Sequence, residues 1–136
     1  MLTLIAPLLI MQAAPPNPDW NCDKPTRQQE MNWCAGQDYE TADRALNRQW
    51  KRTAAAMKAR DEAHDDHAQP SDDRPGFFAS LLEAQRAWLR LRDAHCRLEG
   101  YEARGGSLEP LLVATCKTAL NEARTAELQR LAAPGL

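Results

Sequence analysis

The chain has 136 residues, a length that fits one domain with a single modest hydrophobic core. Its 17 Lys and Arg residues nearly balance its 19 Asp and Glu residues, which gives a formal net charge of -2. This balance argues against a nucleic-acid partner, which favours a strongly basic domain, and suits a cationic protein partner better.

Residues 1–14 form an uncharged apolar run that ends in Ala13 and Ala14, just before a proline-rich stretch. The run is shorter than the roughly 20 apolar residues that a transmembrane helix needs. An apolar run followed by small residues is typical of a secretory signal, although no Lys or Arg precedes it. We therefore expect residues 1–14 to be a signal peptide and the protein to be periplasmic or secreted. The alternative is an apolar tail on a cytosolic protein.

Four cysteines follow the apolar run, and an even number of cysteines in an exported chain is typical of disulfides. A zinc site is the alternative, but the sequence has no C-x-x-C pair and the cysteine spacings are wide. Four cysteines allow three pairings. We favour Cys22–Cys34 and Cys96–Cys116, because the two members of each pair are close in sequence.

The stretch 15–25 is rich in proline and predicts an irregular segment before a helical domain over residues 26–132. Thr26 and Gln29 have the spacing of a capping box, in which two side chains satisfy free backbone N–H groups at a helix start. This pattern predicts that the first helix begins here.

Apolar residues then recur in steps of mostly three or four, which is the spacing of one helix face. The pattern fades by about His67, before Pro70, and Gly36 permits a bend inside the helix. The predicted inner face consists of Met31, Cys34, Tyr39, Ala42, Leu46, Trp50, Thr53 and Met57.

An acidic stretch from Asp61 to Asp73 contains six Asp and Glu residues and no Lys or Arg. With Pro70 inside it, this composition predicts a solvated helix end and loop. His64 and His67 could hold a metal only loosely on such an exposed segment, and we expect no metal site there.

A second helix is predicted from near Pro75 or Phe77 to about Tyr101. Its apolar residues suggest a broad inner face made of Leu81, Leu82, Trp88, Leu89, Leu91, Cys96 and Leu98. Gly100 marks the end of this helix, and Gly105 and Gly106 mark the turn that follows.

A third helix is predicted to start with Ser107 or Glu109 as its cap and Pro110 in its first turn. Its predicted inner face consists of Leu112, Val113, Cys116, Leu120, Ala123, Leu128 and Leu131. No β-type alternation occurs in the sequence. The fold class is therefore all-α, a small antiparallel three-helix bundle stapled by two disulfides.

Arg92 stands four residues from Cys96 and shares its helix face, so an inward Cys96 draws Arg92 inward too. A buried guanidinium needs a carboxylate partner, and Asp43 lies on the apolar side of the first helix. We predict a structural ion pair between Asp43 and Arg92 that fixes the register of the two helices. The functional alternative is that the two residues line a binding cleft.

The sequence has no nucleophile elbow, P-loop, zinc-protease or dinucleotide-binding motif. The cysteines are expected to be oxidised, so none is a free nucleophile. These observations favour a binding protein over an enzyme, with no cofactor and no catalytic residue.

The chain resembles the LprI-like lysozyme inhibitor family over about Cys22 to Leu131. The resemblance rests on three groups of residues: Cys22 with Gln28–Ala35, Tyr39, Asp43 and Trp50; Ala84–Trp88 with Arg92 and Cys96; and Gly105–Ser107 with Pro110, Cys116 and Arg124. It implies an α-helical module of the bacterial envelope, periplasmic or secreted, which in some members inhibits lysozyme.

Lysozymes are typically cationic and have a carboxylate-lined cleft. Two segments are candidate partner-binding sites: Arg104, Gly105, Gly106 and Ser107 as a plug for such a cleft, and the acidic stretch with Asp65 and Asp66 as a steering patch. An ordinary solvated loop is the alternative in both cases. For the whole protein, the alternative to a lysozyme inhibitor is an envelope interaction or scaffold module.

Overall fold

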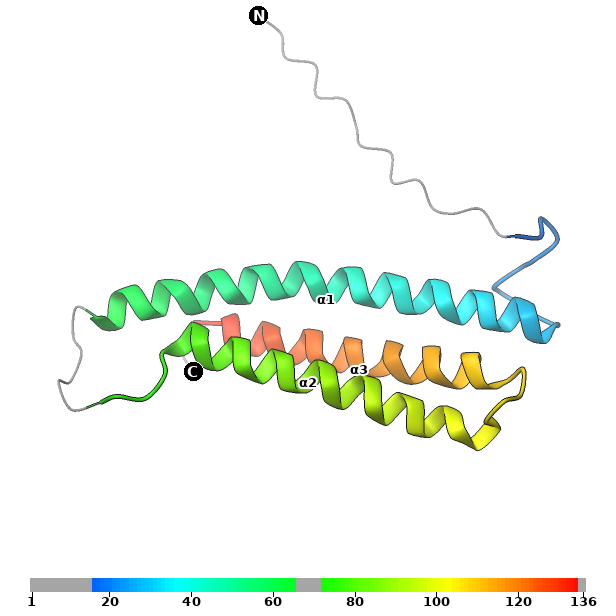
Figure 1. The fold of residues 1–136 in the computed structure, drawn as a ribbon. Coiled ribbons are helices and arrows are strands. Elements are labelled where there is room, and N and C mark those ends of the chain that lie inside the picture. The colour runs from blue at the N-terminus through cyan, green and yellow to red at the C-terminus, as the bar shows by residue number, and fades with distance from the viewer. Residues whose placement is uncertain (1–15, 66–71, 135–136) are drawn as a thin grey trace, which may run out of the picture.

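The computed structural model describes residues 16–65 and 72–134, so the predicted signal peptide lies outside the described residues. Three long helices, α1 (Gln28–Asp65), α2 (Phe77–Gly100) and α3 (Glu109–Ala132), run antiparallel to their neighbours in sequence, and a 3-10 turn, η1 (Tyr101–Ala103), follows α2 (Figure 1). No strand occurs in the part of the chain that is described. The all-α three-helix prediction is confirmed.

Both predicted disulfides are present. Cys22 is bonded to Cys34 and Cys96 to Cys116, each with a Cα–Cα distance of 5.5 Å. The first bond fastens the irregular N-terminal segment to α1, and the second joins α2 to α3 across their connecting turn. The disulfide pairing predicted from the cysteine spacing is therefore confirmed.

The core lies along the predicted inner face of α1. Leu46 and Met57 are buried there against Leu81 of α2 and Leu128 of α3, and Trp50 packs against this cluster. α1 continues through Gly36 without interruption, so the glycine does not break the helix. The regular apolar spacing of this helix was therefore sufficient to identify its buried face.

The start of α1 is capped by Glu30 and not by the predicted pair of Thr26 and Gln29. The Glu30 carboxylate accepts hydrogen bonds from the backbone N–H groups of Asn21, Thr26 and Arg27 at 2.6, 2.9 and 3.3 Å. A carboxylate has two oxygens and can serve three donors, whereas a Gln amide offers one oxygen. Glu30 thus closes the helix start and also holds the segment around Asn21.

These hydrogen bonds predict a pH-dependent contribution to stability. The backbone N–H of Asn21, followed by that of Thr26, holds the pKa of Glu30 below its ordinary value of 4.5. A lowered pKa in the folded state means that the contribution is complete above the unfolded pKa and is lost as pH falls through the folded pKa. We expect Glu30→Gln to be less stable than wild type at neutral pH. The difference should be fully present above pH 4.5 and should shrink as the pH of the denaturation curves is lowered below that value.

Asp61, at the predicted helix end, has a structural role that the sequence did not indicate. Its carboxylate accepts hydrogen bonds from the backbone N–H groups of Phe77 at 2.6 Å and Phe78 at 3.0 Å, at the start of α2. The N-cap residue of that helix, Gly76, offers no side chain for this purpose. A residue of α1 therefore caps α2, which the local sequence around α2 could not reveal.

Asp61→Ala should lower the free energy of unfolding by about 1 kcal/mol, because loss of a helix cap has this typical cost. Asp61→Asn should recover most of the loss, since Asn caps nearly as well as Asp. The matched control is Glu62→Ala at the neighbouring exposed position, which should change stability by less than about 0.5 kcal/mol. Urea denaturation measures all three, and equal losses at the two positions would refute the cap.

The start of α3 also differs from its prediction. Leu108 is the N-cap and makes no side-chain capping hydrogen bond, while Pro110 lies in the first turn as expected. Neither Ser107 nor Glu109 is the N-cap. The Glu109 carboxylate instead accepts a hydrogen bond from the backbone N–H of Gly105 at 2.7 Å, so it stabilises the preceding turn.

The predicted inner face of α2 is too broad. Leu91 and Leu98 are 63% and 64% exposed, and Leu89 is also exposed. The buried residues of α2 form a narrower stripe: Leu81, Gln85, Arg92, Cys96 and Gly100. α2 contacts α1 and α3 mainly along this stripe and through half-buried neighbours such as Phe78 and Trp88, which leaves the leucines on its outer side in solvent.

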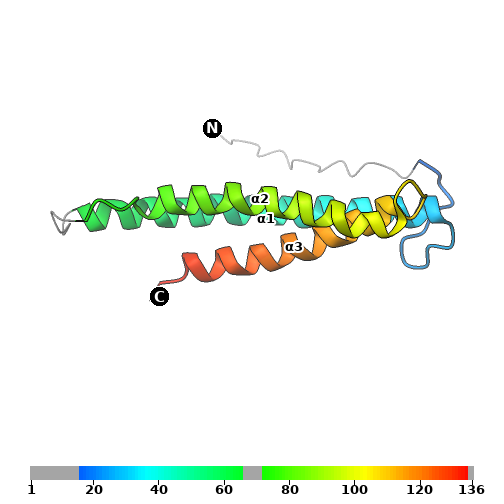
Figure 2. The same ribbon diagram turned by 60° about the horizontal axis from the view of Figure 1, so that its bottom comes forward.

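On α3, two residues of the predicted inner face, Ala123 and Leu131, are exposed. The C-terminal half of this helix draws away from α2, whereas the two helices lie close together at their connecting turn (Figure 2). No helix among the described residues combines the length and the apolar character that a membrane crossing requires.

Candidate functional site

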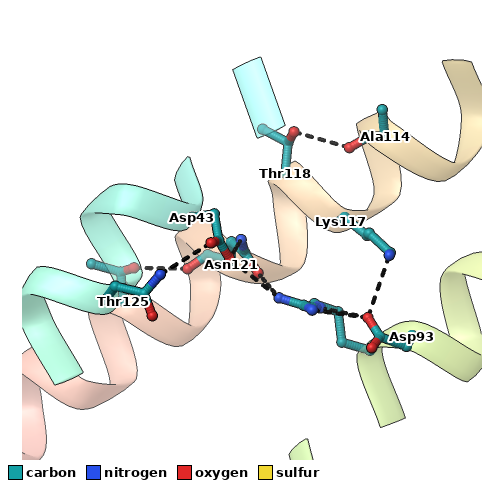
Figure 3. Close-up of polar contacts among 9 residues, drawn as sticks. Asp43, Asp93, Ala114, Lys117, Thr118, Asn121 and Thr125 are labelled. Carbon is teal, nitrogen blue, oxygen red and sulfur yellow. Dashed lines mark hydrogen bonds and ion pairs between the residues drawn. The ribbon is translucent and has the colours of Figure 1, made fainter. Parts of the chain in front are cut away.

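A polar network connects all three helices near the middle of α3 (Figure 3). At its centre Arg92 of α2 donates a hydrogen bond from Nη1 to Oδ1 of Asn121 on α3, at 3.0 Å. Asn121 in turn donates from Nδ2 to Oδ1 of Asp43 on α1, at 3.2 Å. The direct distance from Arg92 Nη1 to Asp43 Oδ1 is 3.5 Å. The structure therefore brings the predicted pair together with Asn121 between them.

The second carboxylate around Arg92 belongs to Asp93. Its Oδ1 accepts hydrogen bonds from Nε and Nη2 of Arg92 at 3.0 and 2.9 Å, and lies 3.4 Å from Nζ of Lys117. Partial burial acts to raise the pKa of Asp93, but the hydrogen bonds and charge of Arg92, helped by Lys117, outweigh it and lower the pKa. Asp93 thus stays ionised and compensates the buried guanidinium.

The residues of this network differ in how far they are exposed to solvent. Asn121 is fully buried and Arg92 is 7% exposed, while the side chain of Asp43 is 35% exposed. The guanidinium carbon of Arg92 also lies over the rings of Trp88 and Tyr39, at 5.5 and 5.9 Å from their centroids. A guanidinium enclosed in this way fixes how the three helices pack. Little of its surface is accessible to a binding partner.

Asn121 was missed from the sequence. It lies next to Leu120 on α3, and a single Asn beside an apolar stripe gives no indication that it faces inward. The signal that could have found it is its spacing of seven residues from Leu128, which is fully buried on the same helix face.

The turn from Arg104 to Ser107 is exposed and projects from the end of the bundle (Figure 1). Gly105 has φ +78°, a conformation in which a residue with a side chain is strained. Backbone hydrogen bonds close the turn, from Arg104 N–H to the carbonyl of Tyr101 at 3.2 Å and from Gly106 N–H to that of Ala103 at 2.8 Å. The turn therefore has one defined shape.

Two further contacts hold the turn in place. Nδ2 of Asn32, near the start of α1, donates to the carbonyl of Ser107 at 2.8 Å. The guanidinium carbon of Arg104 lies 4.4 Å from the ring centroid of Tyr101, close enough for a cation–π contact. Arg104 is thus exposed and positively charged, and is supported by an aromatic ring.

A shallow pocket of about 520 Å³ lies beside the turn. It is lined by Tyr39, Gly105, Gly106, Glu109, Pro110, Val113, Ala114 and Lys117. The lining is mostly small or apolar, and Glu109 and Lys117 provide one charge of each sign. A side chain of a bound partner could enter this pocket while the turn contacts the partner's surface.

One of the two acidic candidates, Asp65, lies at the opposite end of the molecule from the turn. Asp65 is the last residue of α1, and Asp66 lies outside the described residues. The turn contacts α1 near Asn32, about 50 Å from Asp65 at the helical rise of roughly 1.5 Å per residue. The structure therefore places the two candidate partner-binding segments at separate ends and does not form one surface from them.

His95 and Glu99 lie near the sulfur of Cys116, and His95 Nε2 is 2.9 Å from Glu99 Oε1. Because Cys116 is bonded to Cys96, its sulfur is not a thiolate that could bind a metal ion. Only His95 and Glu99 remain as possible metal ligands in this group. At the other end, the ring of His64 contacts that of Phe77 edge-on, while His67 lies outside the described residues.

Comparison with known proteins gives a family match over most of the chain. The family model described as "Lysozyme inhibitor LprI" matches residues 22–128, a range that includes both disulfides and the turn. The chain is 44% identical over 128 residues to "Uncharacterized protein R02472" of Rhizobium meliloti (strain 1021), and the alignment covers 91% of this chain and 89% of that protein. No solved structure matches the chain.

Proposed function

The chain belongs to the LprI lysozyme inhibitor family, and from this premise we propose that it is an exported protein that binds and inhibits lysozyme and catalyses no reaction. The observation that carries the proposal is the family match over residues 22–128. The two disulfides support export, because such bonds form and persist in oxidising compartments such as the periplasm.

The proposed contact with lysozyme is the turn from Arg104 to Ser107. Glycosidases hydrolyse sugar chains with a pair of carboxylates in a cleft, and a guanidinium such as that of Arg104 is a suitable partner for a carboxylate. The backbone and side-chain hydrogen bonds of the turn reduce the entropy that is lost on binding, because its shape is already defined. The neighbouring glycines allow the backbone to approach a partner closely.

The test is the rate at which lysozyme lyses a peptidoglycan suspension. Wild-type protein at micromolar concentration should slow lysis, and Arg104→Ala should raise the concentration needed by about tenfold or more, as expected for loss of a charge-assisted contact. Arg86→Ala is the matched control, because Arg86 is an exposed arginine on α2 away from the turn. Equal weakening by the two substitutions would remove the turn from the proposed contact.

The role of the acidic end can be tested separately in the same lysis assay. If negative charge at Asp65 and Asp66 steers the cationic enzyme, the Asp65→Asn, Asp66→Asn double variant should slow association and reduce its dependence on salt. Normal inhibition by Arg104→Ala together with weak inhibition by the double variant would move the contact to the acidic end. A wild-type protein without effect on lysozyme would leave the envelope interaction module as the function to pursue.

A further inference from the structure

A second and larger hollow lies at the other end of the bundle and is lined by residues of all three helices. The C-terminal half of α3 draws away from α2 at this end (Figure 2). It is a groove of about 910 Å³, within the size range of small-molecule sites. Met57 and Leu81 give it an apolar floor, and Phe77 and Leu131, which are 43% and 38% exposed, lie at its rim. Exposed apolar side chains around a hollow favour an apolar ligand.

Arg124 of α3 lines the same groove and has a nitrogen without a partner. Its Nε donates to Oε1 of Gln85 at 3.0 Å, and its Nη1 lies 2.8 Å from Oε2 of Glu127. Its guanidinium carbon is 5.8 Å from the ring centroid of Trp88, and its side chain is 11% exposed. The remaining nitrogen, Nη2, is buried and has no hydrogen-bond partner among the residues that the structure describes. An orphaned donor of this kind is costly, and an acceptor that reaches it recovers the cost.

The charges around the groove determine which kind of ligand fits. Of the carboxylates in the lining, Asp61 accepts the N–H groups at the start of α2 and Asp72 is paired with Arg74 at 2.7 Å. Arg60 donates to the carbonyl of Ala133 at 3.0 Å and forms no ion pair with a carboxylate of residues 16–65 or 72–134. The groove therefore offers an apolar floor, a guanidinium donor without a partner, and a lining in which three arginines face two carboxylates.

We propose that this groove binds a single-chain amphiphile with an anionic head, such as a long-chain carboxylate, whose oxygen accepts a hydrogen bond from Nη2 of Arg124. The hydrocarbon chain lies on Met57 and Leu81, between Phe77 and Leu131. Because Nη2 is buried, the side chains that cover it must move before the head reaches it. This site is separate from the turn that we propose for lysozyme, and its test does not depend on lysozyme binding.

The experiment is isothermal titration of the oxidised protein with dodecanoate below its micelle concentration. We expect one bound dodecanoate per chain and binding at least tenfold weaker for dodecyltrimethylammonium, which has the same chain and the opposite charge. Octanoate should bind more than tenfold more weakly than dodecanoate, because each buried methylene strengthens binding about fourfold.

Variants separate the head from the chain. Arg124→Met should weaken dodecanoate binding at least tenfold and leave binding of dodecyltrimethylammonium unchanged. Leu131→Asp, at an exposed position that tolerates a polar residue, should weaken binding of dodecanoate and also of the cationic amphiphile. The matched control is Leu98→Asp, since Leu98 is 64% exposed on α2 and does not line the groove.

Three results would overturn the proposal. The first is that dodecanoate does not bind, or binds without saturating at one per chain. The second is that the cationic and anionic amphiphiles bind equally well, which removes the role of Arg124. The third is that Leu131→Asp and Leu98→Asp weaken binding equally, because binding would then depend on surface leucines in general and not on the groove.

Discussion

Replacing both Cys96 and Cys116 by alanine should lower the free energy of unfolding by about 3 kcal/mol. A cross-link that closes a loop of 20 residues restricts the unfolded chain by about this amount. The loop includes the turn and the ends of α2 and α3, so its opening cannot be separated from unfolding of the bundle. Differential scanning calorimetry should show Tm lower by about 10 °C.

The other disulfide is the matched control. Cys22–Cys34 closes a loop of 12 residues, for which the same chain-entropy argument gives nearly the same value. However, Cys22 is exposed and lies in a segment outside the core. Besides the disulfide, a hydrogen bond from the backbone N–H of Asn21 to the carboxylate of Glu30 holds this segment. We expect this segment to detach locally, so Cys22→Ala, Cys34→Ala should cost clearly less. An equal loss from both pairs would show that the N-terminal segment unfolds together with the helices.

Asn121→Ala should be the most damaging substitution of a single polar side chain, at a cost of about 3 kcal/mol. It removes an acceptor from the guanidinium of Arg92 and a donor from the carboxylate of Asp43 in a fully buried position. A buried hydrogen bond to a charged group typically contributes about 1.5–3 kcal/mol, and the groups left behind pay for their desolvation. Urea denaturation with far-UV circular dichroism measures this loss.

The chain supplies a close control for this substitution. Asn47 donates from Nδ2 to the other oxygen of Asp43 at 3.0 Å, but it is exposed on the surface of α1. Asn47→Ala should therefore change stability by less than about 0.5 kcal/mol. A large loss at Asn47, or a negligible one at Asn121, would contradict the view that the buried network fixes the arrangement of the helices.

The sequence predicts the three helices and their disulfides well, because both depend on local spacing. The inner face of α1 follows from apolar residues such as Leu46 and Met57, and the cysteine pairs follow from short separations. The breadth of the buried face of α2 does not follow in the same way. Leu91 and Leu98 are as apolar as Leu81, and only the way in which α2 packs on the other two helices leaves them exposed.

Helix caps were predicted less well, for two different reasons. Asp61 caps a helix that begins at Phe77, 16 residues away, and capping patterns consider only three or four neighbouring residues. Glu30 lies within that range of Thr26 and Arg27, but the spacing of Thr26 and Gln29 pointed to the neighbouring residue instead. In the candidate site, the spacing of Arg92 and Cys96 suggested that Arg92 faces inward. Its central partner Asn121 depends on how α3 packs, which one helix cannot show.

The most direct test of the account compares oxidised wild-type protein with Cys96→Ala, Cys116→Ala protein in the lysozyme lysis assay. If a disulfide-locked bundle presents the turn to lysozyme, wild type should slow lysis at micromolar concentration, and the variant should be much weaker at temperatures near its lowered Tm. Unchanged lysis with the oxidised wild-type protein, across lysozymes of different types, would contradict the proposed function.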